Sequence, residues 1–171
     1  MQMSGGPVGG RTGDALAGSS CANTPVFSFE GTALRARLLD VHDGDTATVA
    51  AEVYPGRVCQ LSLRLAGIDA PEMASETVGA EVARCRLLQL LTGLEVDGAT
   101  THLTRGQMRA LLQRGVHLVH VACGENDKYG RVLARVSREE GGRHAGDVLL
   151  EEGLVNPYGG GTKLAFKKQG A

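Results

Sequence analysis

The sequence predicts a single α+β domain that is rich in β-strands. Its 171 residues suit one domain with its own core. Twenty-five glycines and the absence of tryptophan indicate many turns rather than a helical bundle. Segments that read as strands also outnumber those with the helical period. The formal net charge of −1 supplies no overall basic field, so any hold on a polyanion must be local.

The two ends of the chain and its cysteines narrow the classes of protein that fit this sequence. Residues 1–25 are rich in Gly, Ser, Ala and Thr and predict a disordered tail, followed by a domain over 26–168 and a terminus at 169–171. The chain has no membrane span and no apolar core of a secretory signal, so we expect an intracellular protein without a membrane partner. The scattered cysteines form no CxxC pair, which disfavours a zinc site. The histidines, His42 among them, are expected to be solvated or hydrogen-bonded.

Three strand-like runs open the domain, over residues 32–41, 46–53 and 58–66. Pro55-Gly56 predicts a hairpin turn between the last two. In the third run the leucines at 61, 63 and 65 alternate with polar residues. Because side chains alternate across a strand, Arg64 should face away from the leucine row and into a cleft.

Two helices are predicted next. Residues 77–91 have the helical period, and Gly93 offers a C-terminal stop. The predicted apolar stripe is Val78, Val82, Cys85 and Leu88, and Glu81 and Arg84 lie off this stripe. A second, short helix starts at a capping box made by Thr104 and Gln107. Leu103 and Met108 have the spacing of a hydrophobic staple at the same end, and Gly115 closes this helix.

The last third of the chain predicts a strand at 116–122, a turn at 124–129 and an antiparallel strand at 131–137. A turn at 139–142 and a helix over 145–152 follow; the helix should bury Val148 and Leu149 and end at Gly153. The segment from Tyr158 onward reads as a loop.

Two aspartates are candidates for a cation site. Asp45 and Asp69 each stand at a strand end beside a turn, so two paired strands can bring both carboxylates to one rim. Oxygen ligands of this kind suit Ca²⁺ or Mg²⁺, and so few charged ligands would bind Ca²⁺ weakly, with a Kd on the order of 10⁻⁴ to 10⁻³ M. The alternative is plain turn chemistry, with Asp43 capping an Asp-Gly turn.

Further charged residues have the chemistry needed to cleave a phosphodiester. Glu72 follows Pro71, which fixes the backbone, and its carboxylate can deprotonate a water. The guanidinium groups of Arg64 and Arg131 match the oxygens of a phosphate. Taken alone, Glu72 also fits a solvated loop residue, and either arginine fits a surface ion pair.

Together, these motifs resemble the staphylococcal nuclease (thermonuclease) family, over roughly residues 32 to 163. That family is marked by a DGDT turn, an R-L-x-G-I-D-x-P-E segment, a helix opening with G-x-E-A, and D-x-Y-G-R-x-L-A. The matching segments here are 43–46, 64–72, 79–82 and 127–134, and the stretch from Gly153 to Tyr158 fits the family's end segment.

The resemblance implies an OB-like five-stranded Greek-key barrel packed against two or three helices. It implies that Asp45, Asp69 and the Ala70 carbonyl ligate Ca²⁺, with Mg²⁺ as a substitute, and that Asp43 lies in the outer shell. The catalytic residues would be Arg64, Glu72 and Arg131, and the substrate-binding residues would be Lys128, Tyr129 and Tyr158.

The implied activity is that of a monomeric, Ca²⁺-dependent endonuclease that hydrolyses DNA and RNA, prefers single strands and leaves 3′-phosphates. The rival class is a non-catalytic or weakly active nuclease-like module that binds nucleic acid or protein. The segment near 94–114 is an insertion relative to the family. We expect it to be a harmless insertion, with a lid or a partner surface as alternatives. If it packs over Arg64 it would block the cleft. The end of the chain is short, so we expect the family's C-terminal helix to be missing or shortened.

Overall fold

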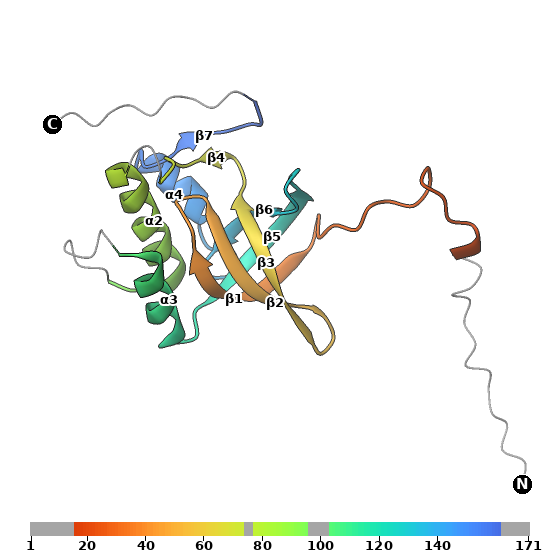
Figure 1. Cartoon of the computed structure of the whole chain (residues 1–171), viewed down its shortest axis with the longest axis horizontal. Helices are drawn as coiled ribbons and strands as arrows, with labels where there is room; N and C mark the ends of the chain where they lie inside the picture. Colours follow the sequence, from red (N-terminus) through yellow and green to blue (C-terminus); the bar gives the residue numbers. More distant parts are fainter. Residues whose placement is uncertain (1–15, 74–76, 96–102, 162–171) are drawn as a thin grey trace, which may run out of the picture.

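The structure, a computed structural model, describes residues 16–73, 77–95 and 103–161. Five strands close into a barrel with the order β1-β2-β3-β6-β5 (Figure 1). Their bounds are β1 Ala33–Val41, β2 Thr46–Tyr54, β3 Arg57–Leu65, β5 Leu118–Asn126 and β6 Val132–Ser137. The predicted β-rich α+β class and the five-stranded OB-like barrel are therefore confirmed.

Barrel closure depends on two pairings that join strands distant in the sequence. β1 pairs antiparallel with β2 and, along its other edge, with β5. β3 pairs antiparallel with β2 and parallel with β6. A parallel pair needs a crossover connection, and here helices and β5 lie between the two strands in the sequence. The hairpin between β2 and β3 turns at Gly56, which has a positive φ of 76°.

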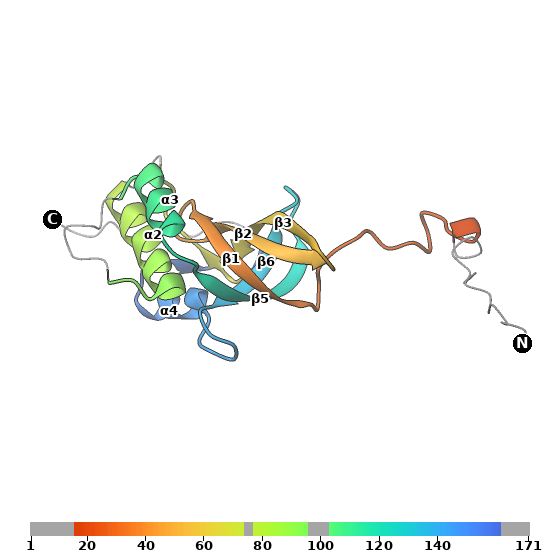
Figure 2. The same cartoon turned by 90° about the horizontal axis from the view of Figure 1, so that it is seen from below.

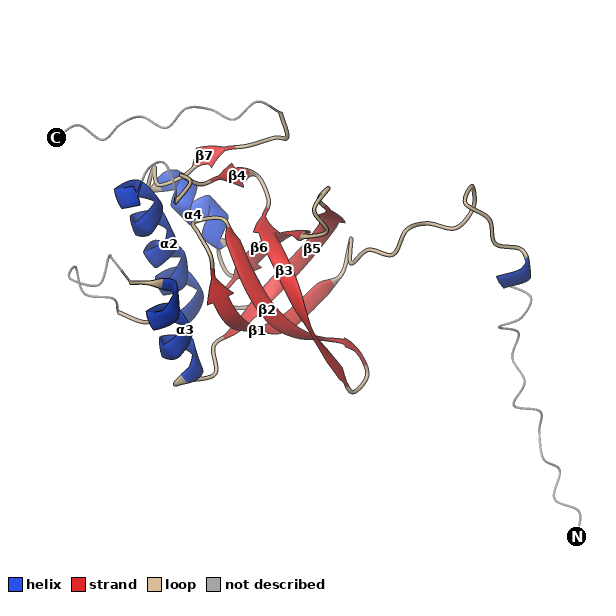
Figure 3. Cartoon of the chain, in the orientation of Figure 1, coloured by secondary structure: helices blue, strands red, loops and turns tan. Residues whose placement is uncertain are grey.

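The helices α2 (Thr77–Thr92), α3 (Arg105–Gln113) and α4 (Ala145–Glu151) gather on one side of the barrel (Figures 2 and 3). Alternate residues of the strands fill the barrel with small and medium apolar side chains, and leucines of the helices extend this core. A further two-stranded sheet pairs β4 (Ile68–Asp69) with β7 (Asn156–Pro157). None of the helices within the described residues is long and apolar enough to span a bilayer.

The start of α3 agrees with the prediction in detail. Thr104 is the N-cap, its hydroxyl accepts from the N–H of Gln107, and the Gln107 side chain accepts from the N–H of Thr104. Met108 is fully buried and Leu103 packs against the core, as a hydrophobic staple requires.

The buried face of α2 differs from the predicted stripe. Val78 is 64% exposed, whereas Arg84, assigned to the polar side, is only 5% exposed. The buried residues of α2 are Ala80, Ala83, Arg84, Cys85, Leu87, Leu88 and Leu91, so Cys85 and Leu88 of the predicted stripe are confirmed. This observed set also has the helical period, so periodicity alone could not separate the two choices. Arg84 is accepted in it because its guanidinium donates to the Leu103 carbonyl.

Two strand boundaries and the burial of one helix residue also differ from the predictions. β5 continues to Asn126 instead of ending at Ala122, so the turn is confined to residues 127–130. Arg131 lies just before β6 rather than inside it. In α4, Leu149 is buried but Val148 is only half-buried.

Parts of some predictions lie outside the described residues. These parts are residues 1–15 of the tail, 96–102 of the insertion and the final residues 162–171. The expectation that the family's C-terminal helix is missing or shortened concerns these final residues. The described part of the tail, residues 16–25, is exposed throughout.

Candidate active site

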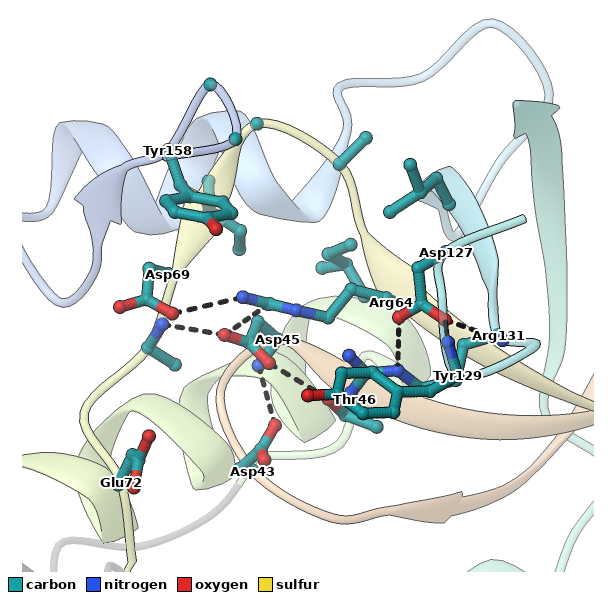
Figure 4. A pocket seen from close by; sticks show the side chains of 18 of the residues that line it. Asp43, Asp45, Thr46, Arg64, Asp69, Glu72, Asp127, Tyr129, Arg131 and Tyr158 are labelled. Carbon is teal, nitrogen blue, oxygen red and sulfur yellow. Dashed lines mark hydrogen bonds and ion pairs between the residues drawn. The ribbon is translucent and has the colours of Figure 1, made fainter. Parts of the chain in front are cut away.

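A hollow of about 1210 Å³ opens at one end of the barrel, beside the ends of β2 and β3 (Figure 4). Five segments form it: the β1–β2 turn, the end of β3, the stretch around β4, the β5–β6 turn and the residues after β7. Every residue that the sequence singled out lines this hollow, namely Asp43, Asp45, Arg64, Asp69, Ala70, Glu72, Lys128, Tyr129, Arg131 and Tyr158.

The β1–β2 turn fixes Asp45. Oδ1 of Asp43 accepts from the N–H of Asp45 at 3.1 Å, which is the turn cap expected of this residue type. Gly44 packs so closely that an added Cβ would lie 2.8 Å from Cβ of Ala83 and 3.0 Å from Cβ of Ala70. The turn therefore docks directly on α2 and on the segment after β4.

Arg64 lies between two of the carboxylates. Its Nη1 contacts Oδ2 of Asp45, and its Nη2 lies 3.1 Å from Oδ1 of Asp69. The Arg64 side chain is 11% exposed, at the inner wall of the hollow. It points there because it stands on the outer face of β3, opposite the buried Leu63 and Leu65, as the alternation predicted.

Asp45 is the most strongly perturbed acid of the site. Burial and the neighbouring charge of Asp43 raise its pKa to about 6, although Arg64 and a hydrogen bond from the N–H of Ala70 act in the opposite direction. Oδ1 of Asp45 also accepts from the hydroxyl of Thr46 at 2.9 Å. The raised pKa indicates that Arg64 and the Ala70 hydrogen bond together do not offset the cost of burying a charge beside Asp43.

The β5–β6 turn positions Arg131. Oδ1 of Asp127 accepts from the N–H of Tyr129 at 2.8 Å and from the N–H of Arg131 at 2.9 Å. Oδ2 accepts from Nε of Arg131 at 2.7 Å. Burial opposes ionisation of Asp127, but these hydrogen bonds and the arginine charge leave its pKa below the usual value. The Tyr129 ring is 72% exposed, with Nζ of Lys128 at 5.0 Å and Cζ of Arg131 at 5.5 Å from its centroid.

The β4–β7 pair places Tyr158 on the opposite rim. Its N–H donates to the Gly67 carbonyl at 2.9 Å, directly after the short sheet. Its ring lies above Asp69 and the guanidinium of Arg64 (Figure 4). Glu72 is exposed, and in the same view it lies beyond Asp43, away from Arg64.

The donor set fits a hard divalent cation in its chemistry. Five carboxylates line the hollow against three cationic side chains, and the candidate ligands are all oxygens. The carboxylates do not converge on a point, because Arg64 stands between Asp45 and Asp69; no three His, Cys, Asp or Glu side chains among the described residues form a compact metal-binding group. Joint ligation by both aspartates requires the guanidinium to move.

Three features of the hollow were not assigned by sequence reasoning. Thr46 donates to Asp45, Asp127 holds Arg131, and β7 carries Tyr158 to the rim. Thr46 and Asp127 stand inside recognised motifs, which is the signal that could have found them. The two-residue pairing of β4 with β7 has no such signal.

The described part of the insertion does not cover Arg64. Residues 94, 95 and 103–114 are absent from the lining of the hollow, and α3 packs against β1 instead. No protein-family model and no curated protein matches the chain. The fold and the side chains therefore provide the basis for a functional assignment.

Proposed function

We propose that this chain is a metal-dependent endonuclease of the staphylococcal nuclease type, acting on phosphodiester bonds of DNA and RNA. The observation that supports this proposal is the meeting of two arginines, paired aspartates and Glu72 in one hollow, although they come from segments far apart in the sequence. The scissile phosphate would lie between Arg64 and Arg131. The resemblance carried by the motifs points to the same assignment.

The arginines bind and stabilise the phosphate. A phosphodiester gains negative charge on its oxygens as water attacks, and guanidinium groups can donate two hydrogen bonds each to those oxygens. Arg64 is held by Asp45 and Asp69, and Arg131 by Asp127. The contact with Asp127 fixes Arg131 before substrate arrives, which lowers the reorganisation needed during the reaction. Arg64 would turn from the two aspartates towards the phosphate when the cation takes their oxygens.

Glu72 takes the proton of the attacking water. The water oxygen forms the new bond to phosphorus, the bond from phosphorus to the 5′ oxygen breaks, and the released 5′ oxygen takes up a proton. The products are a 3′-phosphate and a 5′-hydroxyl. Glu72 is exposed and lines the hollow, so its carboxylate can reach a water there and accept its proton.

Asp45, Asp69 and the Ala70 carbonyl would hold Ca²⁺, or Mg²⁺ in its place, with Asp43 in the outer shell. A cation bound there supplies positive charge against the phosphate and lowers the pKa of associated water. The exposed ring of Tyr129 and the half-buried ring of Tyr158 would stack on the bases of a single strand, and Lys128 offers a charge to a neighbouring phosphate.

The test is cleavage of single-stranded DNA and RNA with Ca²⁺, with Mg²⁺ and with a chelator. Wild type should cleave only with metal, and Arg64→Ala and Glu72→Ala should each lose most of the rate. The matched controls are Arg135→Ala and Glu140→Ala, two exposed residues outside the hollow, and these should cleave like wild type. Metal-independent cleavage, or equal rates for Glu72→Ala and Glu140→Ala, would contradict the proposal.

A second candidate function is a nuclease-like module that binds nucleic acid or protein without cutting. One observation favours it: both arginines of the hollow are already paired with carboxylates of this chain. It predicts that wild type retains a single-stranded oligonucleotide without hydrolysis at any Ca²⁺ or Mg²⁺ concentration, and that Glu72→Ala leaves this binding unchanged.

A further inference from the structure

A second hollow, of about 560 Å³, opens where α3 packs beside β1, β2 and β3. Arginines from two elements line it: Arg37 from β1, and Arg105 and Arg109 from α3. The two arginines of α3 are four residues apart and therefore lie on one face of the helix. The remaining polar lining consists of Asp40, His42, Thr48, Gln60 and Gln113.

A β-bulge places the acid of this hollow. The pairing of β1 with β2 shifts register between Leu38 and Asp40, where one extra residue enters β1. As a result Arg37 and Asp40 both face the outside of the barrel, while Leu38 and Val41 are buried. In a regular strand Arg37 and Asp40 would face opposite sides, so the bulge is what brings both residues to the same hollow.

Asp40 holds both helix arginines through one atom. Its Oδ2 accepts from Nε of Arg105 at 2.8 Å and from Nε and Nη2 of Arg109 at 2.8 and 2.6 Å. Asp40 is 3% exposed, whereas the side chains of Arg105 and Arg109 are 45% and 51% exposed. One carboxylate faces two guanidinium groups, so positive charge remains on the open side of the hollow.

Arg37 adds to that excess of donors. Its Nη2 donates to the Gly115 carbonyl at 3.3 Å, while its buried Nε has no hydrogen-bond partner within the described ranges. A purely structural ion pair that holds α3 on the barrel needs a single arginine. Two solvent-exposed arginines held by one acid, with a third arginine lining the same hollow, match a phosphate.

The two hollows lie along one outer face of β2 and β3. Thr46 pairs with Arg64 at the first hollow, and Thr48 pairs with Ser62 next to it. Thr48 and Gln60 then line the second hollow. Since a strand rises about 3.3 Å per residue, Gln60 lies about 13 Å along β3 from Arg64. Ser62 between them is small, polar and exposed, so the path is open.

We propose that this second hollow, built by the bulge in β1 and by α3, binds a backbone phosphate of the nucleic-acid strand whose scissile phosphate occupies the first hollow. The proposal rests on the proposed function for its ligand and adds a substrate-length preference to it. The insertion thereby extends the binding path along the barrel face, a surface on which OB folds bind oligonucleotides. A trinucleotide fills the first hollow alone, whereas a dodecamer reaches both.

Steady-state kinetics on a trinucleotide and on a single-stranded dodecamer test this in Arg109→Gln and Arg105→Gln. We expect each variant to raise KM for the dodecamer about fivefold to tenfold, with kcat and KM for the trinucleotide unchanged. The slope of log K for dodecamer binding against log salt should also become shallower by about 0.7 for each lost contact. Arg114→Gln, an exposed arginine at the end of α3 that does not line the hollow, is the matched control.

Arg109→Lys, which keeps the charge, should recover part of the dodecamer affinity and excludes a folding defect. Equal losses on trinucleotide and dodecamer, or identical behaviour of Arg109→Gln and Arg114→Gln, would overturn the inference. The inference would also be overturned if inorganic phosphate, in about tenfold excess over the dodecamer, abolished dodecamer binding equally in wild type and in Arg109→Gln. Anisotropy with a labelled dodecamer in chelator measures binding apart from cleavage. Arg109-dependent binding there, together with no cleavage after Ca²⁺ or Mg²⁺ is added, contradicts only the proposed function.

Discussion

Nη2 of Arg64, at the end of β3, lies 3.1 Å from Oδ1 of Asp69 in β4, across the turn at residues 66 and 67. The same guanidinium contacts Asp45 at the start of β2. One buried arginine thus joins three strand ends, and it lies where the proposed chemistry places the phosphate. Arg64→Ala affects phosphate binding, charge balance and local packing together. A substitution that preserves the positive charge is therefore needed to test the geometry of the guanidinium.

Arg64→Lys should lower kcat about 10²- to 10³-fold, the effect of losing one preorganised donor to a developing oxyanion. A lysine keeps one positive charge near Asp45 and Asp69 but cannot donate a planar pair of hydrogen bonds to a phosphate. Steady-state cleavage of single-stranded DNA measures the change, with Arg135→Lys, in an exposed ion pair, as control. A rate for Arg64→Lys within threefold of wild type would contradict the role given to its fork geometry.

Gly44→Ala should reduce the free energy of unfolding by about 1–3 kcal/mol, the usual range for overpacking. The added Cβ would approach Cβ of Ala83 at 2.8 Å, so the turn must move away from α2 and take Asp45 with it. Urea denaturation measures the stability, and cleavage should fall as well. Gly79→Ala is the control, since its Cβ would meet only Cγ of Pro71 at 3.8 Å, and alanine favours the helix. Equal effects of both substitutions would be incompatible with this packing.

Asp127 acts as a positioning residue for Arg131, and two substitutions separate its contacts. Asp127→Asn keeps an oxygen for the N–H groups of Tyr129 and Arg131 but loses the ion pair with Nε of Arg131. Asp127→Ala loses both. We expect kcat to fall in the order wild type, Asn, Ala, with the asparagine variant retaining most of the stability in urea. If Asn and Ala lose kcat equally, the turn hydrogen bonds do not contribute to positioning.

Asp40→Asn should destabilise the protein by about 1–3 kcal/mol near pH 7, the typical cost of a lost charged hydrogen bond. Burial tends to raise the pKa of Asp40, but hydrogen bonds from Arg109 and Arg105 lower it overall. A carboxyl whose pKa is depressed on folding contributes stability above its unfolded pKa, near 3.9, and that contribution disappears as pH falls through the folded value.

The difference between wild type and Asp40→Asn should therefore shrink as the pH falls below about 4. Urea denaturation as a function of pH measures it. The control is Asp147→Asn, because Asp147 pairs with Arg135 at the surface and exposed pairs contribute little. A difference that grows as the pH falls would show that the depressed pKa of Asp40 is not what stabilises this contact.

Local patterns were sufficient to predict most of the elements and the members of the candidate site. Alternation along β3 placed Arg64 opposite the leucines, and the capping box fixed the start of α3, because both depend on residues close in sequence. The predicted buried face of α2 was wrong in part because overlapping stripes share the helical period: Cys85 and Leu88 are buried, whereas Val78 is exposed and Arg84 is buried with its guanidinium donating to the Leu103 carbonyl. His42 was expected to be solvated or hydrogen-bonded, and its Nε2 lies 2.9 Å from Nη2 of Arg105. This partner is 63 residues away in the sequence, so no local pattern indicates it.

The sequence by itself thus determined the strand-rich class, the turn chemistry around Asp45 and the set of charged residues proposed for phosphodiester cleavage. Tertiary structure alone decided where those charges meet: Arg64 between Asp45 and Asp69, Tyr158 on the rim through β4 and β7, and two helix arginines on Asp40. The physical reason is that strand register and helix docking are set by the packing of the whole core. A one-residue bulge in β1 therefore moves Asp40 to the outside of the barrel, although no local pattern marks it.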